Sequence, residues 1–134
     1  IICRNTMART FRIQSQMFQD WKDCGMDKLN LVDYRTNFAM LNSITTGTDA
    51  FPLDSAIVRE LKQNLKNAEW IVSQIRPRQV QRGVHLKYLC IALTPQEASW
   101  ERVAFMIGYS DGGESLRNRS WRKINRILKQ CKQS

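Results

Sequence analysis

The sequence predicts a small all-α domain of five or six helices. Apolar residues recur every three or four positions along most of the chain, which is the spacing of one helix face. Residues that favour helix starts and stops stand at the borders of these periodic segments. The length of 134 residues and the hydrophobic content of 43% are enough for one buried core without metal or disulfide support.

The first two helices are expected before residue 45. Met7 to about Trp21 carries aromatic and apolar residues at loosely helical spacing, and Gly25 ends this pattern. A second helix is expected from Leu29 to about Ile44. Residues 45–52 collect Thr, Gly, Asp and Pro, which are typical of a loop, so this stretch is the best boundary between two parts of the chain.

The third helix has the most regular pattern. It is expected to begin at Asp54 or Ser55, either of which can cap it, and to end near Arg76, because Pro77 disfavours helical geometry at the residue before it. Its apolar face is Ile57, Leu61, Leu65, Ala68, Val72 and Ile75. A fourth helix is expected over residues 78–93, with its first turns weakened by Gly83.

Thr94-Pro95-Gln96-Glu97 has the composition of a capping box with proline in the first turn, so a helix is expected over residues 95–107. Gly108 can end this helix in a left-handed conformation, and residues 109–113 form the turn that follows. The last helix is expected from about Glu114 to residue 131. Its apolar face is Leu116, Trp121, Ile124, Leu128 and Cys131.

Positive charge is concentrated in the C-terminal half of the chain. Residues 1–70 hold nine Lys and Arg against eight Asp and Glu, whereas residues 71–134 hold twelve against four, so that half carries +8 of the net charge of +9. Such a local excess attracts polyanions. Nucleic acid is the first partner that this charge indicates, and an anionic membrane surface is the second.

The two last helices, joined through a glycine turn, have the organisation of a helix-turn-helix at about residues 94–132. Residues 117–132 hold seven basic side chains and no acidic one. Four of the seven are spaced by three or four positions and share one helix face, namely Arg119, Arg122, Arg126 and Lys129. We therefore expect residues 53–134 to be a helical core that contains this motif, and residues 1–52 to be a helical segment that packs on it or oligomerises.

The stretch Arg102-Val103-Ala104-Phe105-Met106-Ile107-Gly108-Tyr109-Ser110-Asp111 resembles the Ile-Ala-x-x-Leu-Gly-Tyr-Ser-Asp segment of AraC-type regulators. Residues 84–130 are also similar to the helix-turn-helix of sigma-factor region 4 and of phage late-gene regulators. The resemblance implies a phage or bacterial protein that binds double-stranded DNA and controls transcription, with the transcription machinery as a further partner. Gly112-Gly113 lengthens the turn by about one residue relative to the AraC-type pattern.

The predicted DNA-binding side chains lie in the turn and in the last helix. They divide into residues expected to contact base edges and residues expected to contact phosphates. Three residues at the start of that helix are expected nearest to base edges: Arg117, Asn118 and Arg119. Basic residues farther along are expected to contact phosphates: Arg122, Lys123, Arg126 and Lys129. Ser110 and Ser115, with the amides of the first turn, are expected to hold one more phosphate. Trp100 and Trp121 are interpreted as core anchors.

No pattern in the sequence indicates an enzyme, a cofactor or a metal site. The four cysteines include no Cys-x-x-Cys pair, and His85 is the single histidine, without a carboxylate placed to orient it. The acidic run Asp20, Asp23, Asp27 and Asp33 lacks the Gly and Glu of a calcium loop. No apolar run is long enough to span a membrane, so we expect a cytoplasmic protein that does not enter the membrane.

Two other functional classes stay open. A phage protein for DNA packaging or replication would carry the same motif but would form a ring or another higher oligomer. A protein-interaction module, such as an inhibitor, would place its basic helix on an acidic partner and show no salt-dependent affinity for DNA. A homodimer also stays open, because the N-terminal segment is rich in apolar residues and nearly neutral.

Overall fold

A computed structural model describes residues 27–45 and 55–133 of the chain. Every regular element in these two ranges is helical, which confirms the all-α prediction. Six α-helices lie within them, together with one π-helical turn that we label η1. In chain order the elements are α2 (Leu29–Val32), α3 (Tyr34–Thr45), α4 (Ser55–Ser73), α5 (Arg78–Val84), η1 (His85–Leu89), α6 (Trp100–Met106) and α7 (Gly113–Gln133).

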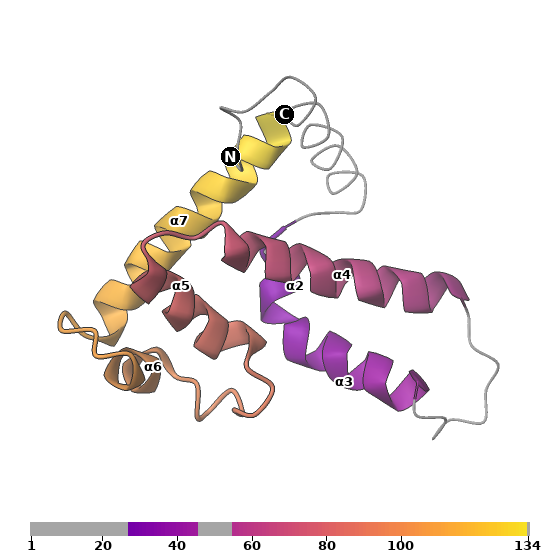
Figure 1. Ribbon diagram of the computed structural model, residues 1–134, viewed down its shortest axis with the longest axis horizontal. Coiled ribbons are helices and arrows are strands. Elements are labelled where there is room, and N and C mark those ends of the chain that lie inside the picture. Colours follow the sequence, from indigo (N-terminus) through magenta and orange to yellow (C-terminus); the bar gives the residue numbers. More distant parts are fainter. Residues whose placement is uncertain (1–26, 46–54, 134) are drawn as a thin grey trace.

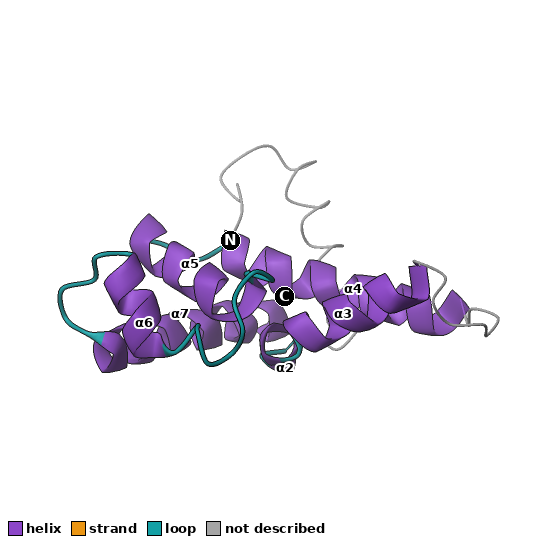
Figure 2. Cartoon of the chain, turned by 90° about the horizontal axis from the view of Figure 1, so that it is seen from below, coloured by secondary structure: helices purple, strands orange, loops and turns teal. Residues whose placement is uncertain are grey.

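The helices are arranged as two connected groups (Figure 1). The antiparallel pair α3 and α4 forms one end of the molecule, while α5, α6 and the long α7 form the other. The view in Figure 2 shows the same division, with α6 lying next to α7. Residues 29–45 therefore lie beside α4 and η1, which bring them into contact with the C-terminal half of the chain.

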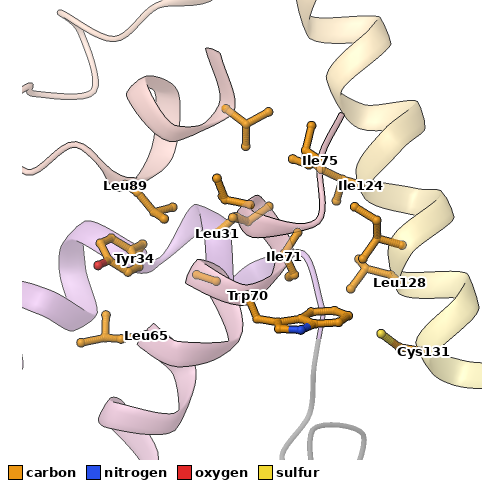
Figure 3. Packing of buried hydrophobic residues seen from close by; sticks show 14 of the residues in the cluster. Leu31, Tyr34, Leu65, Trp70, Ile71, Ile75, Leu89, Ile124, Leu128 and Cys131 are labelled. Atoms are coloured by element: carbon orange, nitrogen blue, oxygen red, sulfur yellow. The ribbon is translucent and has the colours of Figure 1, made fainter. Parts of the chain in front are cut away.

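One hydrophobic core joins the two groups. Leu31 of α2, Ile71 of α4 and Ile124 of α7 are fully buried and belong to the same cluster (Figure 3). A second, smaller cluster around Val103 and Leu116 joins α6 to the start of α7. The described part of the N-terminal segment thus packs on α4 and on the C-terminal half of the chain.

Two of the expected helices are found with small differences at their borders. The helix expected over residues 29–44 is divided at Asp33, where the backbone leaves helical geometry and α3 begins anew at Tyr34. The helix that was expected to start at Asp54 or Ser55 is α4, and it ends at Ser73, ahead of the proline at position 77. The helix expected over residues 7–21 lies outside the described residues.

The helix expected over residues 78–93 ends four residues early, at Leu89. Its last carbonyl groups are bound by a side chain from α3. The guanidinium of Arg35 donates to the carbonyl oxygens of Leu86, Lys87 and Cys90 at 3.1, 2.7 and 3.1 Å. A cation at this position satisfies carbonyls that have no partner within the helix and also complements the helix dipole. A cap that comes from a helix fifty residues away cannot be read from the local sequence.

Arg35→Ala is expected to destabilise the fold by about 1–2 kcal/mol, because three charge-assisted hydrogen bonds to a partly exposed helix end are lost. Urea unfolding followed by circular dichroism measures this change. Arg59→Ala is the matched control, since Arg59 is an exposed arginine on α4. Equal stabilities for the two variants would contradict a capping role for Arg35.

The prediction of one helix over residues 95–107 is wrong in its first five positions. The expected capping box does form: Thr94 N–H donates to Glu97 Oε1 at 3.0 Å, and Glu97 N–H donates to Thr94 Oγ1 at 3.2 Å. It closes only a single turn, because Ser99 takes an extended conformation and caps α6 itself through the amide of Arg102 at 3.3 Å. Two N-cap residues five positions apart compete, and the second one starts the helix.

Candidate nucleic-acid interface

The helix α6 ends in a left-handed glycine, as the sequence predicts. Gly108 has φ of 69°, Gly108 N–H donates to the carbonyl of Phe105, and Tyr109 N–H donates to that of Ala104 at 2.8 Å. This pair of hydrogen bonds is a Schellman motif, which turns the chain away from the helix axis. Residues 107–112 then lead to α7, so α6 and α7 are two helices joined by a short turn.

The start of α7 lies directly on the start of α6. A Cβ atom built on Gly113 would lie 2.7 to 2.8 Å from backbone atoms of Trp100 and Glu101, closer than real side chains come. Gly112 before it has φ of 89°, a conformation that side chains rarely adopt. The sequence pattern predicts only that Gly112-Gly113 lengthens the turn. The structure gives the two glycines separate tasks, a left-handed bend and a close contact between helices.

An aromatic cluster fixes both helices to the rest of the molecule. The ring of Tyr88 in η1 contacts Trp100 of α6 and Trp121 of α7 edge to face, with centroids 5.9 Å apart in each pair. Burial among these rings raises the pKa of Tyr88 to about 12. Trp100 and Trp121 are partly buried against the two cores. They are therefore core anchors, as predicted, rather than free stacking platforms.

The α7 helix has one apolar and one basic face. Its buried side includes two residues that the predicted apolar face omitted, Ser120 and Ile127. The opposite side is exposed and carries Arg122, Arg126 and Lys129. Among the described residues, none of these three side chains has a hydrogen bond or an ion pair. Their charges face solvent. Because the three positions are spaced by four and by three, they form a row along the axis of α7.

The predicted residues at the start of α7 do not all share this exposed basic face. Asn118 lies on it and is exposed. Arg117 lies about 140° around the helix from Arg122 and pairs with Glu114 at 3.9 Å. Arg119 is half-buried, and its Nη1 donates to Tyr109 Oη at 3.3 Å. Lys123 is likewise half-buried at the flank of the face.

A polar groove of about 690 Å³ runs along the first half of α7. Asn118, Trp121, Arg122 and Asn125 line its length. Asn125 was not among the predicted DNA-binding residues. It follows Asn118 by seven positions, which is two helical turns, and this spacing is the signal that could have identified it. Asparagine and arginine are the side chains that pair bidentately with adenine and guanine.

The two serines predicted to hold a phosphate have acidic neighbours. Ser110 is exposed in the turn, and Ser115 lines the polar groove together with Asp111 and Glu114. Both carboxylates stand at the N-terminal end of α7, where they complement the helix dipole. A phosphate at the same place would be repelled by them, so this arrangement disfavours the first turn as a phosphate site.

The described residues offer no grouping of three or more His, Cys, Asp or Glu side chains that could hold a metal ion. No helix among them is long and apolar enough to cross a membrane. Comparisons with protein-family models, with curated proteins and with solved structures find no match for this chain.

Proposed function

We propose that this chain binds double-stranded DNA through α6, the turn and α7, acting as a helix-turn-helix, and that it regulates transcription. The observation that carries the proposal is the exposed basic face of α7, where Arg122, Arg126 and Lys129 have no protein partner among the described residues. Three cations without a partner on one helix face contribute little to the stability of the fold. The same three charges would contribute strongly to the affinity for phosphates. The role in transcription follows from the resemblance to AraC-type, sigma and phage regulators.

The shape of the α6–α7 unit suits the major groove. A single helix fits this groove, which is about 12 Å wide, when its outer face is free of other elements. The outer face of α7 meets this condition over Asn118, Arg122, Asn125 and Lys129, which are all exposed. The supporting helix α6 lies against the opposite side, through Val103, Ala104 and Leu116 in the second cluster. In this arrangement α7 contacts the DNA, and α6 supports α7 from its inner side.

The contacts divide into two kinds. Arg122, Arg126 and Lys129 supply charge to phosphates, which gives affinity for any sequence. Asn118 and Asn125 supply neutral donors and acceptors to base edges, which gives sequence preference. Arg117 and Arg119 were predicted from the sequence as base readers, but Arg117 lies off this face beside Glu114 and Arg119 is half-buried beside Tyr109, so we assign neither of them to a base.

Asn118→Ala and Asn125→Ala are each expected to lose about 1–3 kcal/mol on a preferred site selected from a random duplex pool, and little on random DNA. The slope of log affinity against log salt stays unchanged, because asparagine carries no charge. Asn42→Ala on α3 is the control, since Asn42 is an exposed asparagine far from α7 in sequence. Unchanged discrimination in both α7 variants would remove these residues from base reading.

Fluorescence anisotropy of a labelled random duplex, titrated with the whole chain at two salt concentrations, tests the proposed function. We expect saturable binding that weakens steeply as salt rises. Absence of salt-dependent affinity would contradict the proposal and favour a protein-interaction module. Light scattering on the same sample separates a monomer or homodimer from the ring expected of a packaging or replication protein.

A further inference from the structure

The outward face of α6 carries an unusually exposed aromatic side chain. Phe105 is 88% exposed, and Met106 beside it is 45% exposed. The two side chains line one wall of a pocket of about 440 Å³, and Leu93 lines it from the segment before α6. A phenylalanine that is exposed to this extent contributes little to folding, and an apolar pocket around it is typical of a binding site.

The rim of this pocket is acidic. Glu97 and Glu101 line it together with a single arginine, Arg102, so its three charged side chains sum to −1 in a chain of net charge +9. The hydrogen bonds from Thr94 lower the pKa of Glu97, and this carboxylate therefore remains ionised. Two carboxylates repel phosphate groups, which argues against both nucleic acid and an anionic membrane surface as the occupant. They attract a lysine or an arginine.

The pocket is separate from the DNA-reading face. None of its lining residues belongs to α7, and none of the residues that line the polar groove belongs to α6. Glu101 nevertheless lies close to the start of α7, because its backbone meets Gly113. A molecule that occupies the pocket would lie next to α7 and leave Arg122, Arg126 and Lys129 free.

We propose that this pocket is a docking site for another protein, which inserts an apolar side chain beside Phe105 and presents lysine or arginine to Glu97 and Glu101. The partner segment is short and amphipathic, with basic residues on either side of its apolar anchor. A few anchor side chains that become fully desolvated in a pocket carry most of the binding energy of protein interfaces. This inference does not rest on DNA binding, since the pocket and its charges are independent of α7.

Titration of the whole chain with a helical peptide of leucine and lysine tests the inference, with nuclear magnetic resonance shifts of residues 93–106 as the readout. A peptide in which glutamate replaces every lysine keeps the same apolar pattern and tests the charge. We expect saturable binding of the lysine peptide, no binding of the glutamate peptide, and an affinity roughly tenfold or more lower for Phe105→Ser. Glu101→Lys should weaken the lysine peptide as well. Met40→Ser is the control, because Met40 is also an exposed apolar residue, lies on α3 and does not line the pocket.

Four results would overturn the proposal. The first two are equal binding of both peptides and unchanged binding by Phe105→Ser. The third is self-association of the parent chain that disappears in Phe105→Ser, measured by sedimentation, because a second copy would then occupy the pocket. The fourth is weaker binding of duplex DNA by Phe105→Ser, which would assign the pocket to the DNA interface. Failure of the parent chain to bind DNA leaves the peptide result intact and affects the proposed function alone.

Discussion

Gly113→Ala is expected to destabilise the protein by about 3 kcal/mol, at the upper end of what overpacking usually costs. The added methyl group would lie 2.7 Å from the amide nitrogen of Glu101 and 2.8 Å from the carbonyl carbon of Trp100. Backbone atoms cannot rotate away as a side chain can, so α6 and α7 have to separate at their starts. Thermal unfolding measures the loss, and weaker binding to a selected DNA site should accompany it.

Gly83→Ala is the matched control for this substitution. The atoms nearest to a Cβ at Gly83 would be side-chain methyl groups of Leu116 and Ile107, at 3.2 to 3.3 Å, which can shift by a few tenths of an ångström. Gly83 also lies inside α5, where alanine is favoured over glycine. The two effects oppose each other, so the stability of this variant should stay close to that of the parent. If Gly113→Ala unfolds at the same temperature as Gly83→Ala, α6 and α7 do not approach each other as closely as described here.

The sequence predicts those features of the fold that depend on neighbouring residues. The regular apolar spacing from Ile57 to Ile75 predicts α4, and Gly108 predicts the end of α6, because both signals act within one or two helical turns. Features that depend on distant contacts are missed. The early end of η1 depends on Arg35 of α3, and the role of Gly113 depends on the position of α6.

Among the predicted DNA-binding residues, too, the positions that depend on local spacing were predicted and those that depend on distant contacts were not. Arg122, Arg126 and Lys129 were placed on one exposed face from their spacing alone, and the structure places them there. The pairing of Arg119 with Tyr109 could not be predicted, because it needs the course of the turn between α6 and α7. The number of basic residues in the sequence does not show which of those near the helix start lie on the exposed face. The neutral Asn125 was passed over, although it lines the same groove as Asn118.

The proposed docking pocket lies close to the start of α7, because the backbone of Glu101 meets Gly113. A partner with basic side chains, docked beside Phe105, would add positive charge close to the start of α7. Association with DNA would then become faster and tighter without a change in the structure of α7, since opposite charges steer encounter.

The triple variant Arg122→Ala, Arg126→Ala and Lys129→Ala is expected to bind random duplex DNA on the order of a hundredfold more weakly than the parent at physiological salt. Each phosphate contact contributes about 0.9 to the slope of log affinity against log salt. At about 0.15 M salt this raises the affinity by about fivefold per contact relative to about 1 M salt. The slope should therefore fall by about three. Anisotropy titrations of parent and variant over several salt concentrations measure both quantities.

The triple variant Arg59→Ala, Lys62→Ala and Lys66→Ala removes the same charge from an equally regular exposed row on α4. It lowers the net charge of the chain from +9 by the same three units, so a binding loss caused by total charge alone would be equal in the two variants. Local phosphate contacts predict a large loss only for the α7 variant, because salt screens any charge that lies more than a Debye length of about 8 Å from the phosphates. Both variants should keep the helical signal and unfolding temperature of the parent, since all six side chains are exposed. Equal affinity and equal salt slope for both variants would therefore remove α7 as the DNA-binding helix, and its basic face would belong to an acidic protein partner.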